Sequence, residues 1–173
     1  MAFAYNFTED VRRALVAARE EADRLRHAYV GTEHLALGVL RTARGSAASV
    51  LAPLDATAVA AEIERLAGPG QSSPREAADL PYTSRGKRVL ELAMREALES
   101  GAEDVDVEHL LLGLLREEQG IGGRVLRGAG LELGTARAVV RHMTGERRGS
   151  SFTSTPGRLL LRVLEWAGLA PRG

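Results

Sequence analysis

Apolar residues recur at helical spacing along most of the chain. Between residues 8 and 27, one face carries apolar side chains three or four residues apart, which predicts an amphipathic helix. Thr8, followed by Glu9 and Asp10, suits the start of this helix, because a hydroxyl caps free amides and acidic groups favour the positive end of the helix dipole. A second helix, capped by Thr32, is predicted over residues 33–42. Nearly all of its residues are apolar, so we expect it to be buried on most sides.

Two shorter helices complete the first half of the pattern. One is predicted over residues 46–51, and the other follows Asp55 as its cap, with Val59, Ile63 and Leu66 facing inward. Residues 68–81 contain glycine, proline and serine without periodicity, which is typical of a linker. The pattern then begins again at residue 82, with helices predicted up to Gly101 and over residues 107–117, 122–126 and 135–143.

This second half is an internal repeat of the first. Residues 30–40 read Val-Gly-Thr-Glu-His-Leu-Ala-Leu-Gly-Val-Leu, and residues 105–115 read Val-Asp-Val-Glu-His-Leu-Leu-Leu-Gly-Leu-Leu, 75 positions later. In this register, residues 7–51 and 82–126 share about 17 identities in roughly 45 positions. Glycine recurs in the middle of the second helix, as Gly38 and Gly113. Because glycine costs about 1 kcal/mol against alanine there, we expect another backbone to cross at each of these positions.

The repeat predicts an all-α fold of two four-helix units related by a pseudo-twofold axis, with eight main helices. The predicted domain spans residues 1–145, with repeat one at 7–67, the linker at 68–81 and repeat two at 82–145. Residues 146–173 form a predicted C-terminal tail, in which we expect at most one short helix. Phe152-Thr153 and Arg158-Leu159-Leu160 echo the start of repeat two, so the tail is either a remnant of a third repeat or a chance similarity.

Composition narrows the possible functions. The chain has 23 basic and 23 acidic residues and therefore no net charge, which argues against nucleic acid as a partner. It has no cysteine, so disulfides and thiolate chemistry are excluded. No apolar run is long enough to span a membrane and no leader pattern opens the chain, so we expect a cytoplasmic protein that does not bind membranes. Lys87 lacks the glycine and hydroxyl spacing of a phosphate loop, so no nucleotide or other cofactor is expected.

Several segments resemble one family. Phe7-Thr8, Glu21-Ala22 and residues 31–35 are similar to the first repeat of the N-terminal domain of Clp unfoldases, the ClpC type most of all. Tyr82-Thr83 and residues 87–93 and 107–117 are similar to its second repeat. The resemblance covers about residues 3–145, and the doubled Glu-His-Leu segment makes it specific. In that family the domain is a receptor for substrates and adaptors, attached to ATPase rings that feed the Clp protease.

The resemblance implies a non-enzymatic protein-binding module in the regulation of proteolysis. No ATPase ring is encoded in this sequence, so the implied roles are a free-standing receptor, an adaptor, a decoy or a sink for ligands of the full unfoldase. The resemblance also implies binding of phosphoarginine at Gly31, Thr32 and Glu33 in repeat one. A helix N-terminus attracts phosphate, the Thr32 hydroxyl adds a donor, and the Glu33 carboxylate suits a guanidinium.

Repeat two departs from this arrangement. Asp106 replaces the glycine and Val107 replaces the threonine, so only Glu108 remains, and its role is doubtful. Asp106 can cap its own helix and would repel phosphate. At most one competent site is therefore expected.

Simpler interpretations stand beside this one. In one such interpretation, Glu33 and Glu108 are first-turn carboxylates that only stabilise the helix dipole. In the same way, His34 and His109 are partly buried structural histidines that bind no metal. Phe3, Tyr5 and Tyr82 form either an exposed apolar patch or part of the core and arm packing. One alternative function is a helical regulatory or DNA-associated protein, which the absence of a basic helix face disfavours. Another is a hydrolase built on His34 or His109, for which the sequence shows no nucleophile–base pairing.

Overall fold

The computed structural model describes residues 7–72 and 80–145 of the chain. In these ranges it contains eight helices, which confirms the predicted all-α class. Repeat one consists of α1 (Glu9–Arg24), α2 (Thr32–Thr42), α3 (Gly45–Leu51) and α4 (Ala56–Ala67). Repeat two consists of α5 (Ser84–Ser100), α6 (Val107–Arg116), α7 (Ile121–Gly128) and α8 (Leu133–Gly145).

Local sequence chemistry explains where several helices begin and end. The Thr8 hydroxyl accepts a hydrogen bond from Val11 N–H at 3.3 Å and caps α1. Its counterpart 75 positions later, Thr83, caps α5. Asp55 caps α4 as predicted, with two backbone amides at 3.0 Å from its carboxylate. Gly101 ends α5 in the left-handed conformation that glycine tolerates best, with φ of 68°.

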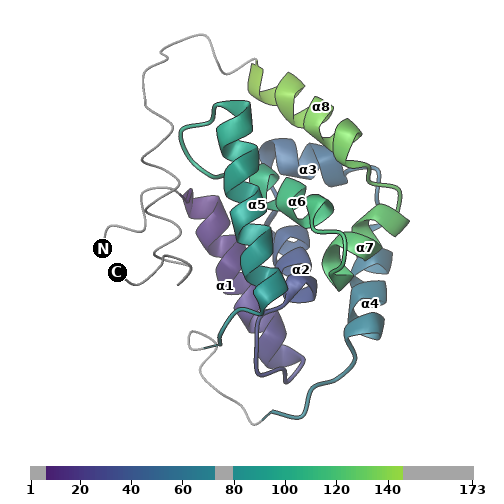
Figure 1. Cartoon of the computed structure of the whole chain (residues 1–173). Helices are drawn as coiled ribbons and strands as arrows, with labels where there is room; N and C mark the ends of the chain where they lie inside the picture. Colours follow the sequence, from purple (N-terminus) through teal and green to yellow (C-terminus); the bar gives the residue numbers. More distant parts are fainter. Residues whose placement is uncertain (1–6, 73–79, 146–173) are drawn as a thin grey trace, which may run out of the picture.

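The two central helices of the fold are α2 and α6. Figure 1 shows them between α1 and α5 on one side and α4 and α7 on the other, while α8 lies beside α3. Both central helices are apolar on nearly all faces, and accordingly almost every residue in them is buried. The core that surrounds them is built mainly from leucine, valine and alanine.

A glycine in each central helix allows the first helix of the same repeat to cross in backbone contact. A Cβ atom at Gly113 would lie 2.6 Å from the Val89 carbonyl oxygen and 2.8 Å from the Ala93 nitrogen of α5. A Cβ atom at Gly38 would meet the Ala14 carbonyl oxygen of α1 in the same way. The predicted crossings are therefore confirmed at both glycines.

Two reciprocal pairings join the repeats. Val30 forms a parallel bridge with Tyr82, and Val105 forms one with Phe7. Under the 75-residue shift Val105 is the counterpart of Val30, and Tyr82 is the counterpart of Phe7. Thr83 N–H donates to the Val30 carbonyl oxygen at 3.0 Å, and Thr8 N–H donates to that of Val105 at 3.1 Å. We call these two pairings the inter-repeat seam. Because each half supplies the partner of the other, the seam follows the predicted pseudo-twofold symmetry.

Ion pairs repeat in the same register. Glu21 is buried on α1 and accepts from Arg41 of α2 at 2.7 Å. Glu96 is buried on α5 and accepts from Arg116 of α6 at 3.0 Å. Each pair ties the first helix of a repeat to its second helix, which reinforces the glycine crossing.

The structure corrects two local predictions and leaves others untested. Gly31 is the N-cap of α2, and Thr32 is its first helical residue rather than its cap. Leu66 was predicted to face inward but is 40% exposed, because α4 lies at the edge of the bundle. Phe3, Tyr5, the middle of the linker and the tail over residues 146–173 lie outside the described residues.

Among the described helices, none alone has the length and composition needed to cross a membrane. Together, α3 and α4 pass that test, but they meet at a bend of 82°.

Replacing Gly38 by alanine should destabilise the domain. The added methyl group would press against the α1 backbone, which cannot yield without moving the helix, and overpacking of this kind costs about 1–3 kcal/mol. Gly134→Ala is the matched control, since a Cβ atom at this α8 position meets nothing within 4 Å. Thermal unfolding should show a lower Tm for Gly38→Ala alone. Equal Tm values for both variants would show that the crossing at Gly38 is loose.

Candidate functional site

The start of α2 is held by a histidine that serves as a capping residue. Gly31 has no side chain to cap the helix, but its N–H donates to His34 Nδ1 at 2.9 Å. Asp106 N–H donates to His109 Nδ1 at the same distance in repeat two. His34 is fully buried and His109 is 3% exposed, so both are more buried than the sequence suggested. The repeated histidine thus has a structural role at two helix starts.

In repeat one this histidine belongs to a buried chain of hydrogen bonds. Because His34 Nδ1 accepts from Gly31, its Nε2 carries the proton and donates to His27 Nδ1 at 2.8 Å. His27 Nε2 in turn donates to the Gly68 carbonyl oxygen at 3.0 Å. Both rings are therefore neutral. Burial, together with the neighbouring His27, lowers the pKa of His34 to about 3.

Together with Glu33, the two histidines also form a possible set of metal ligands. His27, Glu33 and His34 can each place one ligand atom within 4.8 Å of the others. However, the four ring nitrogens of the histidines are already used in the hydrogen-bond chain, and Glu33 lies 3.6 Å from the His34 Nδ1 atom that accepts from Gly31. The ring nitrogens are therefore occupied by hydrogen bonds between neutral imidazoles, and we do not propose a metal at these residues.

Glu33 is a buried carboxylate at the start of α2. It is 8% exposed, and its carboxylate lies over Gly31, where a Cβ atom would stand 2.6 Å from the Glu33 Cδ atom. Its hydrogen bond from the Thr32 hydroxyl is long, at 3.5 Å. Within residues 7–72 and 80–145, no lysine or arginine forms an ion pair with it. A buried carboxylate without a cation is costly, which makes this position a candidate for binding a positively charged group.

Thr32 lies deeper than the sequence suggested. It is 2% exposed, and its hydroxyl accepts a hydrogen bond from Gly122 N–H of α7 at 3.3 Å. Gly120 and Gly122 make this close packing possible, because a Cβ atom at either one would collide with Thr32. The hydroxyl therefore faces the second repeat. The cluster of glycines at residues 120, 122 and 123 is the sequence feature that could have indicated this close packing, and it was not included in the sequence analysis.

The start of α6 differs from that of α2 through Asp106. Its carboxylate accepts hydrogen bonds from Val107 N–H at 2.8 Å and from the Thr8 hydroxyl at 2.9 Å. At Gly31 no side chain can take the corresponding amide of Thr32. Glu108 is buried like Glu33, with 6% of its surface exposed. In repeat one, the Glu33 carboxylate occupies the space that a side chain at Gly31 would fill. In repeat two, the equivalent position is Asp106, which has a side chain.

Tyr82 of the predicted apolar patch is partly buried in the seam, where the Arg19 guanidinium lies over its ring at 5.1 Å from the centroid. Large exposed apolar side chains lie elsewhere in the described part of the chain, at Val16, Tyr29, Leu66 and Met143.

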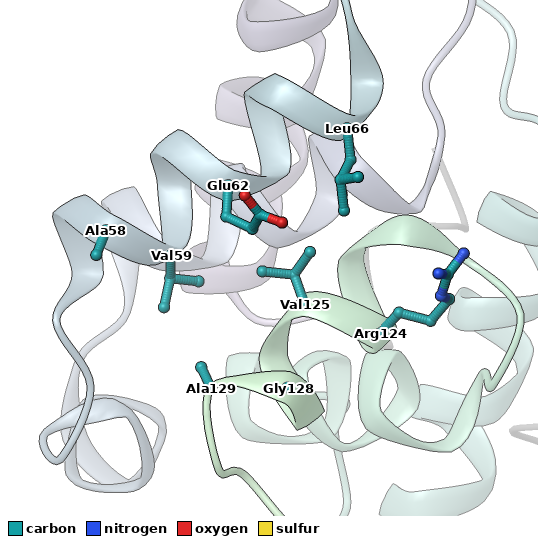
Figure 2. Close-up of a pocket in the computed structure, with 8 residues that line it drawn as sticks. All are labelled: Ala58, Val59, Glu62, Leu66, Arg124, Val125, Gly128 and Ala129. Carbon is teal, nitrogen blue, oxygen red and sulfur yellow. The ribbon is translucent and has the colours of Figure 1, made fainter.

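A shallow groove between α4 and α7 is a second candidate surface. Figure 2 shows Val59, Glu62 and Leu66 on α4 on the side that faces Val125 on α7, with Arg124 at one edge. The groove encloses about 430 Å³ and is lined mostly by apolar atoms. It offers space for apolar side chains of another segment.

Comparisons with known proteins agree with this architecture. The family model of the Clp repeat (R) N-terminal domain matches residues 6–129 and again residues 89–168. The negative regulator of genetic competence ClpC/MecB of Bacillus subtilis is 41% identical over 152 residues, which are 86% of this chain and 18% of that protein. The chloroplastic chaperone protein ClpC of Pisum sativum is 41% identical over 151 residues, or 87% of this chain and 16% of that protein.

Solved structures show the same fold. The N-terminal domain of ClpD from Arabidopsis thaliana superposes with a TM-score of 0.66 at 24% identity, covering 82% of this chain and 96% of that one. The Hsp104 N-terminal domain from Candida albicans gives a TM-score of 0.61 at 18% identity, covering 88% and 97%. The chain spans less than a fifth of the length of the curated relatives described above.

Acid should weaken the fold through His34. The pKa of His34 is about 3 in the folded protein and about 6.5 in an unfolded chain, so the unfolded state binds more protons between these values. The free energy of unfolding should therefore fall as pH is lowered through this range, by up to about 1.4 kcal/mol per pH unit for one proton. Urea unfolding at a series of pH values measures this slope.

Two variants isolate the contribution of His34. His34→Gln removes the titrating ring but keeps an acceptor for Gly31 N–H, so the slope should become shallower. His142→Gln, on an exposed position of α8, should keep the natural slope. Equal slopes in the natural protein and His34→Gln would contradict the neutral pair.

Proposed function

Because the chain belongs to the Clp repeat (R) N-terminal domain family, we propose that it is a non-enzymatic module that binds substrate or adaptor proteins of a Clp proteolysis system. The family and the ClpC-type relatives support this role. Other similar proteins, from Cyanidium caldarium and Porphyra purpurea, are named as homologues of an ATP-binding subunit of the ATP-dependent Clp protease. The present chain matches only a small part of their length, so the ATPase activity named for them is not assigned to it.

The ligand that we propose is a phosphoarginine side chain on a bound protein. The observation that carries this proposal is the Glu33 carboxylate, which is buried at a helix start and has no cationic partner among the described residues. A guanidinium would supply that partner with charge-assisted hydrogen bonds. The amide end of α2 and its dipole favour a phosphoryl group close by.

Repeat one is the proposed site, and repeat two is not. Gly31 leaves the first amide of α2 without a side-chain acceptor, whereas Asp106 occupies the equivalent amide of α6 with its own carboxylate. A phosphoryl group beside Asp106 would meet a like charge, at a cost on the order of a kcal/mol for two charges a few Å apart at a surface. Glu108 is therefore not expected to bind the ligand.

A DNA-associated role is the alternative, and two features disfavour it. The chain has no net charge, and most arginines of the described part pair with carboxylates on their own or a neighbouring helix, as Arg12, Arg24 and Arg41 do. The cytoplasm is the proposed location, and neither nucleic acid nor a membrane is a proposed partner.

Isothermal titration with free phosphoarginine should detect about one site per chain. Glu33→Ala should abolish binding, because it removes the only carboxylate proposed to receive the guanidinium. Glu108→Ala is the matched control from the other repeat, and it should leave the affinity almost unchanged. Two equivalent sites, or loss of binding in Glu108→Ala alone, would contradict the asymmetry.

Gains and losses at the helix starts provide an independent check. Gly31→Asp reproduces the repeat-two sequence and should expel the Glu33 carboxylate from its position, with loss of binding. The double variant Asp106→Gly, Val107→Thr should add a second site. A pull-down comparing arginine-phosphorylated protein with duplex DNA separates the two functions, since capture of DNA alone would support the alternative.

A further inference from the structure

Arg19 is an unusual arginine in this domain. Its Nε atom is buried and has no hydrogen-bond partner among the described residues, and no described carboxylate lies within ion-pair distance of its guanidinium. Its neighbours on α1 behave differently: Arg12 pairs with Glu9, Arg13 with Asp10 and Arg24 with Glu21. A half-buried cation without a counter-charge carries a desolvation cost, and an anion bound beside it would offset that cost.

The pseudo-twofold symmetry shows that the fold does not require a charge at this position. The counterpart of Arg19 in repeat two is Met94, which is 1% exposed, and the counterpart of Tyr82 is Phe7, which is 6% exposed. An apolar pair therefore occupies in one half the positions that Arg19 and Tyr82 occupy in the other. The cation is a feature of repeat one alone.

The seam connects Arg19 to the proposed ligand site. The Arg19 guanidinium lies over the Tyr82 ring, and Tyr82 pairs with Val30, the residue directly before Gly31. The Glu33 carboxylate lies over Gly31. The seam residues Tyr82 and Val30 therefore link a guanidinium without an anion to the helix start that carries a carboxylate without a cation, both in repeat one.

The donors first expected for a phosphoryl group are partly used within the fold. The Thr32 hydroxyl is buried against α7 and bound to Gly122 N–H, and Gly31 N–H is bound to His34. A guanidinium is the side chain best suited to phosphate, because its planar N–H groups donate two parallel hydrogen bonds. Tyr82 holds the Arg19 group by a cation–π contact without consuming any N–H donor.

We propose that Arg19 is the residue that recognises the anionic group of the ligand and so distinguishes phosphorylated from unmodified arginine. In this arrangement Glu33 receives the guanidinium of the ligand, and Arg19 receives its phosphoryl group. The role rests on the proposed function, since it assigns a specificity residue to the same site. Repeat two has Met94 at the equivalent position, so it has no cation there to distinguish phosphorylated from unmodified arginine.

Titration of the full chain with phosphoarginine, arginine and inorganic phosphate tests this role. Arg19→Met installs the residue found at the repeat-two position, so the variant should remain folded, as its thermal unfolding would verify. Its affinity for phosphoarginine should fall at least about tenfold, the loss expected when one charge-assisted bidentate contact disappears. Its affinity for unmodified arginine should not change. Arg19→Lys should retain part of the affinity, and Arg12→Met, at an exposed position of α1, should bind like the natural protein.

The outcomes separate this role from the proposed function. Unchanged phosphoarginine binding in Arg19→Met would refute the role of Arg19 and leave the Glu33 site standing. An equal loss for arginine and phosphoarginine would also refute it, by showing a general effect on the site. Failure of the natural protein to bind phosphoarginine would refute both proposals. Competition by inorganic phosphate in the natural protein, absent in Arg19→Met, would support Arg19 as the anion-binding group.

Discussion

Each repeat reaches across to the other through one short extended pairing, and the positions of the central helix starts depend on it. Val30 pairs with Tyr82, and Val105 pairs with Phe7, so the backbone just before α2 and α6 is fixed by the opposite half of the molecule. The glycine crossings then hold α1 against α2 and α5 against α6. A half-domain would lose one partner of every seam contact, which explains why the duplicated unit forms one shared core.

The seam is symmetric, but the chemistry along it is not. In repeat two, Asp106 satisfies the helix start with its own carboxylate, aided by the Thr8 hydroxyl, and Phe7 and Met94 are apolar. In repeat one, the N-cap residue is Gly31, which has no side chain that could accept a hydrogen bond from the first amides of α2. This half also carries two charged residues without an ion-pair partner in the described part of the chain, Glu33 and Arg19. Duplication therefore preserved the scaffold, while the substitutions concentrated potential ligand contacts in one half.

Features set by local chemistry could be predicted from the sequence. The caps at Thr8 and Asp55 and the end of α5 at Gly101 depend on neighbouring residues only, and the repeated glycines indicated the helix crossings. Features that depend on distant contacts could not be predicted. Thr32 is buried because Gly122, 90 residues away, packs against it, and Leu66 is exposed because α4 lies at the edge of the bundle. The contact between Arg19 and Tyr82 likewise exists only once the seam has formed.

Repeat one alone is proposed to present a ligand site, at the start of its second helix. Backbone NMR of the full chain during addition of phosphoarginine tests it most directly, because it reports each helix start separately. The account predicts saturable shifts of the amide signals at residues 31–33, while those at residues 106–108 stay unchanged. Equal shifts at both helix starts, or shifts confined to the groove between α4 and α7, would contradict it.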